Sequence, residues 1–182
     1  RELEERPVIA KLSLDDRKSF SLIIGKRVLN SEIIDGGKIP VFSANVFEPF
    51  GYVDELLKGF EDFTSDSVLW GIDGDFMVNF MKRGQEFYPT DHCGVLRVIT
   101  DKVHPRYMAR VLEREGMNMK FSRSFRASLD RVRGITFAVP DMKAQTEAMN
   151  KVLKLEEEIS RANKNLSLLA GKKEKILQKY LI

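Results

Sequence analysis

The residues with the most obvious capacity for chemistry fall in two short segments that are rich in acids. Asp73 and Asp75 lie in WGIDGDFMVNF, and Asp91 and His92 lie in YPTDHCGVL. Carboxylates and an imidazole can hold the Mg²⁺ or Mn²⁺ of a nuclease. The Asp-Gly-Asp spacing is also part of a calcium loop, but the other ligands and the terminal Glu are missing. A metal-dependent nuclease that uses these four side chains is therefore one hypothesis.

A structural role explains the same residues without a metal. The glycines of WGIDGD indicate a bend between strands, its acids accept hydrogen bonds from loop amides, and Asp91 orients His92. The two histidines, His92 and His104, and the single Cys93 make no zinc signature. The sequence has no Gly-x-Ser-x-Gly elbow and no phosphate loop. We therefore expect no catalytic residue and no metal in this chain.

A basic segment in the C-terminal half suits a polyanion. Within fourteen positions, one acid, Asp130, accompanies five basic residues: Lys120, Arg123, Arg126, Arg131 and Arg133. Three serines are interleaved with them: Ser122, Ser124 and Ser128. Arg and Ser side chains are common donors to phosphate oxygens. The segment predicts phosphate contacts, although an exposed basic surface with no ligand has the same pattern.

The charge of the whole chain is divided unevenly. Residues 1–101 carry 12 Lys and Arg against 18 Asp and Glu, a net charge of −6. Residues 102–182 carry 18 against 9, a net charge of +9. A basic half points to a polyanionic partner, with nucleic acid as the first candidate.

The elements that must position these residues are short. Apolar runs separated by Gly, Pro, Asn and Asp are Phe20–Ile24, Ile39–Phe42, Gly51–Asp54, Ser67–Ile72, Phe76–Phe80, Val95–Ile99 and Ile135–Val139. This spacing predicts a twisted, mostly antiparallel sheet or a small barrel. Helical patterns cover Pro105–Glu115, with Pro105 in the first turn, and Ser128–Arg133, with Ser128 at the N-cap. The expected fold class is α+β.

One connection is longer than a hairpin needs. Ser43-Ala44-Asn45 interrupts the apolar pattern, and Phe47 and Phe50 follow before the next strand. A two-residue turn would suffice to reverse the chain. The small and amide side chains let the backbone lie close to a neighbour, and we expect Phe47 and Phe50 to anchor the loop. The loop is predicted to support a binding surface or to form part of one.

The last forty residues carry a single periodic pattern. Apolar side chains recur at alternating spacings of three and four, with Lys173 as the one polar member. This heptad seam consists of Val152, Leu155, Ile159, Ala162, Leu166, Leu169, Ile176 and Tyr180. A 3.5-residue period predicts a left-handed coiled coil. A helix over residues 143–181 would be about 58 Å long, too long to bury its seam on a small domain, so we expect a partner helix from another copy or another subunit.

Composition limits the class of protein. With 43% hydrophobic and 31% charged residues among 182, the chain has the profile of a globular protein. No apolar run approaches the roughly 20 residues of a membrane helix. The single cysteine rules out an intramolecular disulfide and fits a reducing, cytoplasmic location. We expect two parts, a domain over residues 1–141 and a long helix over residues 142–182.

Several segments, taken in order, resemble one protein family. They are GGKIPVFSAN with GYVDE, WGIDGD, TDHCGVLRV, HPRYMARVL and ITFAVPDMKAQTEAMNKVLKLEEEI. From about Ser19 to its end, the chain closely resembles one target recognition domain, with the long helix that follows it, of the specificity subunit of type I restriction-modification systems. The ordered set of motifs is specific, and it includes a Pro followed five residues later by a Gln that opens a helix.

The resemblance implies a function that composition alone does not show. Members of this family bind double-stranded DNA, have no catalytic centre, and read one half of a bipartite site per recognition domain through the major groove. A pair of antiparallel helices sets the distance between the half-sites and docks the methyltransferase subunits, which bring S-adenosylmethionine. We therefore expect DNA, a methyltransferase subunit or fused methyltransferase domain, and a restriction subunit as partners, with no cofactor on this chain.

The family's base-reading residues follow no fixed motif, so side-chain chemistry selects the candidates. Arg reads guanine, and Asn and Gln read adenine, through paired hydrogen bonds. The DNA-binding candidates are Ser43, Asn45, Arg83, Gln85, Lys120, Arg123, Arg126 and Arg131. Helix pairing is assigned to the heptad seam.

A full specificity subunit has two recognition domains and two long helices, whereas this sequence has one of each. We expect a half-subunit that dimerises, a fragment, or the C-terminal domain of a fused methyltransferase-restriction enzyme. The missing initial Met favours a partial chain. A homodimer would read a palindromic bipartite site. A further alternative is a coiled-coil interaction protein whose β domain binds no DNA.

Overall fold

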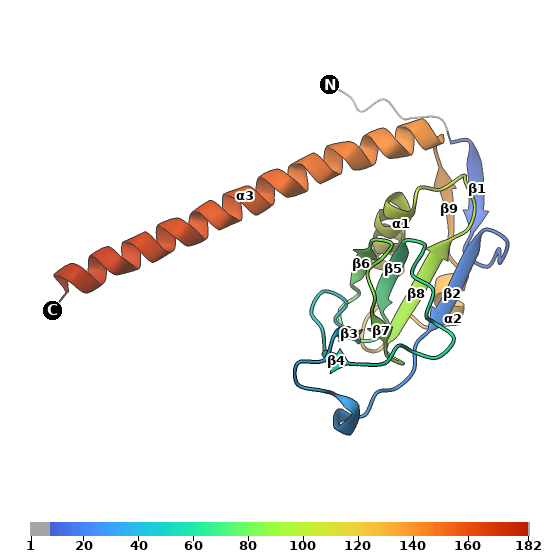
Figure 1. The fold of residues 1–182 in the computed structure, drawn as a ribbon. Helices are drawn as coiled ribbons and strands as arrows, with labels where there is room; N and C mark the ends of the chain where they lie inside the picture. Colours follow the sequence, from blue (N-terminus) through green and yellow to red (C-terminus); the bar gives the residue numbers. More distant parts are fainter. Residues whose placement is uncertain (1–7, 182) are drawn as a thin grey trace. The chain divides into compact units, whose positions relative to one another are not determined.

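A four-stranded antiparallel sheet carries the core in the computed structural model, which describes residues 8–181 (Figure 1). Its strands lie in the order β2 (Phe20–Ile24), β8 (Cys93–Val98), β5 (Ser67–Gly71) and β6 (Val78–Met81). All of β5 is buried because both faces of the sheet are covered. Val68 and Trp70 pack on one face and Leu69 on the other, as the two-residue period of a strand requires.

Two smaller sheets accompany the main one. β1 (Ala10–Ser13) pairs antiparallel with β9 (Thr136–Val139). β3 (Ile39–Phe42) pairs antiparallel with β4 (Gly51–Val53) and parallel with β7 (Tyr88–Pro89). The predicted α+β class with mostly antiparallel strands is confirmed, and within residues 8–181 the strands form three sheets.

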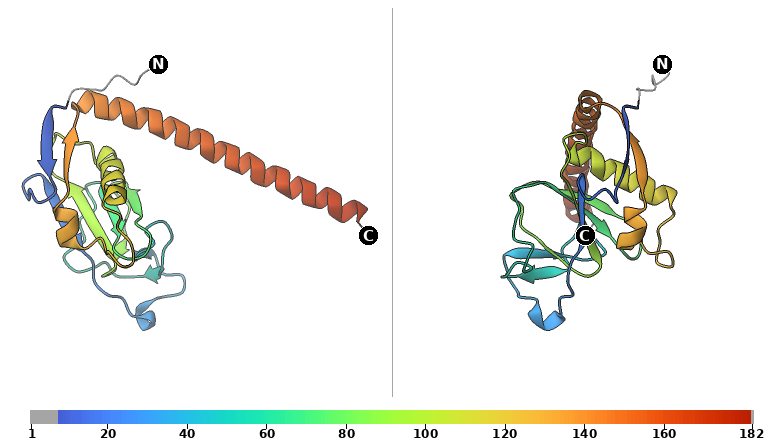
Figure 2. Two further views of the ribbon diagram at one scale, coloured as in Figure 1. Left: turned by 180° about the vertical axis from the view of Figure 1, so that it is seen from behind. Right: turned by 90° about the vertical axis from the view of Figure 1, so that its right-hand side faces the viewer.

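Two helices cover one face of the main sheet. α1 (Pro105–Asn118) contacts β5, β6 and β8, and α2 (Leu129–Arg133) contacts β2. Figure 2 shows both helices on the side of the sheet opposite β3 and β4. Pro105 lies in the first turn of α1, as predicted, where it needs no N–H donor. Ser128 stands at the N-cap of α2, but its side chain makes no capping hydrogen bond. A short 3₁₀ helix, η1 (Asn30–Glu32), precedes β3.

The opposite face of the sheet is covered by aromatic side chains from irregular segments. Leu69 and Val95 pack in one cluster with Phe60, Phe63 and Phe87. The centroids of these three rings lie 5.3–5.4 Å apart, in edge-on or tilted arrangements. The sheet is therefore the middle of three layers, and its strand ends are fixed from both sides.

The long helix, α3 (Met142–Tyr180), begins inside this domain, and the chain from Thr146 onward forms a second unit. Gln145 is fully buried in the first turn. Its Nε2 donates to the carbonyl oxygens of Lys102 and Pro140, each at 2.9 Å, and its Oε1 accepts from the His104 N–H at 2.9 Å. The Pro-then-Gln pattern of the sequence therefore has a structural reason, because this amide satisfies backbone groups where the helix starts.

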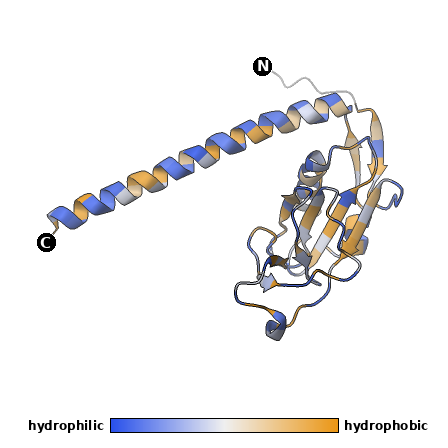
Figure 3. Cartoon of the chain, in the orientation of Figure 1, coloured by the Kyte–Doolittle hydropathy of each residue, from blue (hydrophilic) through white to orange (hydrophobic). Residues whose placement is uncertain are grey.

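The heptad seam of α3 is exposed along most of its length. Leu155, Ile159, Leu166, Leu169 and Ile176 are each 57–63% exposed. Ala162 and Tyr180 are exposed as well, whereas Val152 is half-buried. Figure 3 shows hydrophobic positions recurring between hydrophilic ones along the helix. Helices in proteins draw most of their stability from packing an apolar face, and pairing through this seam remains a prediction.

Gly171 lies within α3, and glycine is a residue that destabilises helices. A Cβ added at this position meets no atom within 4 Å. Glycine inside a helix costs roughly 0.5–1 kcal/mol relative to alanine. We expect Gly171→Ala to stabilise α3 by about that amount, which circular dichroism should detect as a higher melting midpoint of the helical signal. A midpoint that is unchanged or lower would contradict a continuous helix through this position.

None of the described helices combines the length and the apolar character that crossing a membrane requires.

Candidate nucleic-acid interface

Four connections gather at one end of the main sheet. They are residues 43–50 between β3 and β4, residues 72–77 between β5 and β6, residues 90–92 between β7 and β8, and residues 119–128 between α1 and α2. Hydrogen bonds and ion pairs among their side chains and backbones join all four. Segments distant in the sequence therefore form one surface, which carries most of the predicted DNA-binding residues.

Asp73 makes ionic contacts with two other connections at this end of the main sheet. Both of its oxygens pair with the Arg126 guanidinium, with Nη2 at 2.8 Å from Oδ2 and Nε on Oδ1. The same carboxylate shares a hydrogen bond with His92 Nδ1, while Asp91 Oδ2 lies 3.9 Å from His92 Nε2. Burial by itself raises the pKa of Asp73, but the hydrogen bonds from His92 and Arg126 outweigh it and hold the pKa below the ordinary 3.8.

This geometry refines two expectations from the sequence. Asp73 makes the hydrogen bond to His92 Nδ1, with Asp91 near the other ring nitrogen, and Arg126 pairs with the Asp73 carboxylate, while its contact with DNA remains a prediction. The nuclease hypothesis needs Asp73, Asp75, Asp91 and His92 around one metal. Nowhere in residues 8–181 do three or more His, Cys, Asp or Glu side chains gather in a way that could hold a metal ion. Of these acids, Asp73 joins two other loops to its own, because it binds both His92 and Arg126.

The depressed pKa of Asp73 has a consequence for stability. A carboxylate whose pKa is lower in the folded state stabilises the fold above the unfolded pKa, and this contribution disappears as the pH falls through the folded pKa. We expect Asp73→Asn to lower the melting temperature at pH 7 and to lower it much less at pH 2–3. Calorimetry across this pH range measures the difference. An equal loss at both pH values would contradict an ionic role for Asp73.

The basic segment, residues 120–133, spans the turn between α1 and α2, continues through α2, and includes four of the predicted residues. Lys120 ends α1 with a left-handed φ of +56°. Arg123 is exposed, and among residues 8–181 its guanidinium has no hydrogen-bond or ion-pair partner. Arg131 is engaged internally, because its Nη1 donates to the Arg126 carbonyl at 2.8 Å and its guanidinium lies 4.0 Å from the Phe125 ring centroid. Of Arg123, Arg126 and Arg131, Arg123 is the one whose guanidinium has no partner in the described chain.

The Ser43–Phe50 loop is held by the groups that the sequence singled out, except for its aromatics. Ser43 Oγ accepts from Thr90 Oγ1 at 3.1 Å, and Asn45 Oδ1 accepts from the N–H of Phe47 at 2.9 Å. The anchor is Val46, which is fully buried. The expectation that Phe47 and Phe50 anchor the loop is wrong, since they are 58% and 54% exposed. The loop backbone lies close to β5, because the Ala44 carbonyl oxygen would be 2.2 Å from a Cβ placed on Gly71, which explains the glycine at position 71.

Arg83 and Gln85 are not part of this surface. They follow β6, whose last residue, Met81, pairs with Ser67 at the start of β5. The Arg83 N–H donates to Asp66 Oδ1 at 2.8 Å, and Gln85 Oε1 accepts from the Lys82 N–H at 2.7 Å. These residues therefore stand at the far end of the β5–β6 pair, roughly 15 Å of strand away from the four connections.

Cys93 does not add a nucleophile to the site. It is buried in β8, and burial raises the pKa of its thiol to about 12. A thiol that stays protonated is inert as a nucleophile and as a metal ligand.

Comparison with known proteins identifies the family and the fold of this chain. Residues 19–169 match the model of the type I restriction modification DNA specificity domain family. The fold is similar to that of the type I restriction-modification S subunit from M. genitalium, with a TM-score of 0.64, 19% identity, and coverage of 93% of this chain and 45% of that one. Comparison with curated protein sequences finds no match.

Two further solved structures share the fold. One comes from a study of complex assembly and conformational transition of the type I R-M system, with a TM-score of 0.67, 12% identity, and coverage of 98% of this chain and 46% of that one. The other is the HsdS subunit from Thermoanaerobacter tengcongensis, with a TM-score of 0.58, 12% identity, and coverage of 84% and 38%. This chain thus spans less than half the length of each solved relative. The match to the family model covers most of the chain, and the chain belongs to the type I restriction modification DNA specificity domain family.

Proposed function

We propose that this chain reads one half of a bipartite duplex site for a type I restriction-modification system. The recognition domain contacts DNA with the end of the main sheet where the four connections meet, and α3 pairs with a second spacer helix. The proposal rests on two features of the same chain. The basic turn between α1 and α2 presents Arg123 without a partner in the described chain, and the long helix α3 has an exposed heptad seam.

The distribution of charge supports this choice of surface. Residues 102–141 carry nine Lys and Arg against four Asp and Glu, whereas residues 51–66 carry one Lys against five Asp and Glu. Phosphates are attracted to the first segment and repelled by the second. The duplex therefore approaches from the side of the α1–α2 turn, and the acidic residues 51–66, which follow the Ser43–Phe50 loop, lie away from the phosphates.

The module itself is non-catalytic and acts through partners. A methyltransferase subunit or fused domain docks on the paired helices and brings S-adenosylmethionine, and a restriction subunit completes the system in the cytoplasm. A solved relative comes from a study of complex assembly and conformational transition of the type I R-M system, which supports the proposal that this chain acts within a complex. The second helix comes from another copy of this chain, which gives a palindromic site, or from a second recognition domain.

A reconstitution experiment tests the proposal. This chain is mixed with a type I methyltransferase subunit, duplex DNA and methyl-labelled S-adenosylmethionine. We expect label on the DNA only when both proteins are present, and we expect this chain alone to cleave no DNA in Mg²⁺ or Mn²⁺. Cleavage by this chain alone that disappears in Asp91→Ala would overturn the proposal in favour of the nuclease hypothesis.

A further inference from the structure

The turn between α1 and α2 is held rigid by its own aromatic residues. Phe121 is buried, stacks on Phe125 with ring centroids 5.7 Å apart, and lies 5.3 Å from the ring centroid of Phe76. The backbone closes on itself, because the Ser122 N–H donates to the Phe125 carbonyl at 3.0 Å. The Phe125 N–H donates to Ser122 Oγ at 3.2 Å. Residues 122–125 therefore form a closed turn on an aromatic base.

The C-terminal side of the turn is fastened to the main sheet. Ala127 is buried, its N–H donates to the Ile72 carbonyl at 3.0 Å, and its carbonyl accepts from Trp70 Nε1 at 2.9 Å. Arg126 is held by Asp73, and Arg131 holds the Arg126 carbonyl. Each of these two guanidiniums commits part of its donors to partners within the fold, so both brace the turn.

Lys120, where the turn between α1 and α2 begins, has an unfavourable backbone conformation. Lys120 has a φ of +56°, a region that glycine adopts freely and other residues occupy at a cost of about 1 kcal/mol or more. The hydrogen bonds of the helix terminus impose this conformation: the Lys120 N–H donates to the Met117 carbonyl at 2.9 Å, and the Phe121 N–H donates to the Gly116 carbonyl at 3.3 Å. This is the Schellman pattern that ends many helices, and it fixes the point at which the turn leaves α1.

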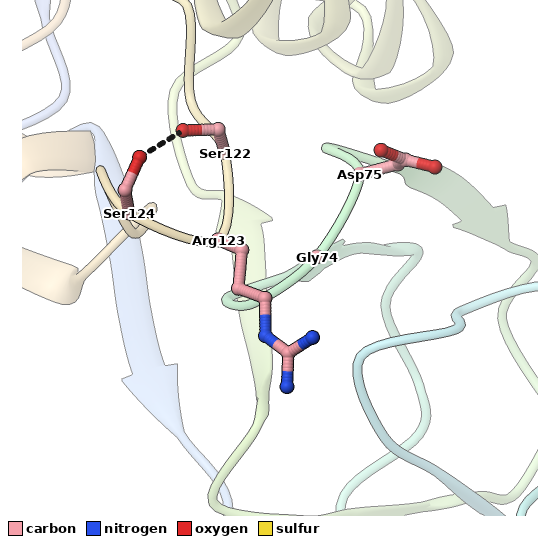
Figure 4. Close-up of a pocket in the computed structure, with 5 residues that line it drawn as sticks. All are labelled: Gly74, Asp75, Ser122, Arg123 and Ser124. Carbon is pink, nitrogen blue, oxygen red and sulfur yellow. Dashed lines mark hydrogen bonds between the residues drawn. The ribbon is translucent and has the colours of Figure 1, made fainter.

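Arg123 stands at the tip of this turn with its donors free. Figure 4 shows the Arg123 side chain extending away from Ser122 and Ser124, whose hydroxyls are 3.3 Å apart and share a hydrogen bond. Gly74 and Asp75, from the β5–β6 connection, line the same open hollow as these three residues. The guanidinium is unpaired and exposed, and the turn that carries it is rigid. Binding through it therefore costs less conformational entropy, because the turn is already ordered.

The neighbouring acid decides which part of DNA this guanidinium suits. Asp75 is exposed, and within the described chain its carboxylate has no ion-pair partner. Figure 4 shows its carboxylate directed away from the Arg123 guanidinium, so Asp75 adds negative charge at the rim of the hollow, which would offset part of the attraction between a phosphate and Arg123. The major-groove edge of guanine is uncharged and offers O6 and N7 to the two-pronged arginine. The hollow therefore favours a base edge over a phosphate.

We propose that Arg123 is the residue that reads a guanine in the major groove and that Arg126 and Arg131 position the turn without contacting bases. The inference rests on the proposed function and deepens it. It divides three arginines that are equivalent in the sequence into one reader and two supports.

The test compares the sequences selected from a randomised duplex pool by the wild-type chain, Arg123→Ala and Arg17→Ala, each with the methyltransferase subunit. Arg17 is an exposed arginine in the β1–β2 connection, so its loss removes the same charge elsewhere. We expect Arg123→Ala to lose the preference for a G·C pair at one position, by roughly 5- to 150-fold, and to keep the remaining preferences. Arg17→Ala should keep every preference.

The outcomes separate the inference from the function on which it rests. If the wild type selects a site and Arg123→Ala selects the same site with undiminished preference at each position, Arg123 is not the reader. If Arg123→Ala weakens binding equally for all sequences, it contacts a phosphate, and the inference is overturned while the function stands. If the wild type selects no sequence, both fail. The melting temperature of Arg123→Ala should equal that of the wild type, because the side chain has no partner to lose.

Discussion

Leu166→Asp should abolish association through α3. Leu166 lies in the middle of the heptad seam and is 63% exposed in the single chain. In a paired helix, the new carboxylate would be buried against an apolar partner, and charges are rarely buried without compensation. We expect the association constant to fall on the order of 100-fold or more, which corresponds to about 3 kcal/mol. Sedimentation equilibrium over a range of chain concentrations measures this change.

A matched variant separates loss of the seam from the effect of an added charge. Ser167 is the next residue along α3 and lies outside the seam, and its hydroxyl donates to the Asn163 carbonyl at 3.1 Å. Ser167→Asp should leave association nearly unchanged. If Leu166→Asp associates as well as the wild type, or if both variants lose association equally, the heptad assignment is wrong.

Trp70→Ala should cause the largest loss of stability in the recognition domain. Trp70 is fully buried in β5, and its ring packs so tightly on Gly94 that a Cβ there would lie 2.1 Å from the indole. Replacing a buried large aromatic residue with alanine costs about 3–5 kcal/mol, out of a total stability of about 5–15 kcal/mol for a typical domain. The substitution also removes the donor to the Ala127 carbonyl and so loosens the Arg123 turn.

Unfolding should not be followed by helical circular dichroism, to which α3 contributes. Tryptophan fluorescence is also unsuitable, because the substitution removes the only tryptophan in the chain. Calorimetry follows the unfolding of the recognition domain directly. Trp70→Phe is the control, since it keeps most of the buried area and removes the indole N–H, and we expect about 1–3 kcal/mol of destabilisation. A loss below about 1 kcal/mol for Trp70→Ala would contradict the central position of this residue in the core.

Local patterns predicted the elements with strong periodicity. Phe20–Ile24 and Ile39–Phe42 coincide with β2 and β3, and the long helix was predicted within one residue of each end of α3. Gly, Pro and Asp bound the strands, and a heptad pattern over forty residues leaves little ambiguity. The sequence did not predict β1 or β7, because β7 has only two residues and both strands exist through pairing with distant partners.

The site was harder to predict because its decisive contacts are distant in the sequence. Arg126 pairs with Asp73 across 53 residues, and no local spacing signals such a pair. Arg83 has the same chemistry as Arg123, but it lies at the other end of the main sheet, which only the pairing of β5 with β6 reveals. Phe47 and Phe50 were expected to anchor their loop because they are aromatic. The smaller Val46 is the residue of this loop that is buried in the core.

The most direct test of the account is selection of bound duplexes from a randomised DNA pool by this chain together with a type I methyltransferase subunit, at moderate salt. The account predicts enrichment of one defined sequence, either a short half-site or a palindrome of two half-sites with a fixed gap, with affinity that falls as the salt concentration rises. Recovery of the pool without any sequence preference would contradict the claim that this chain specifies where the system acts on DNA.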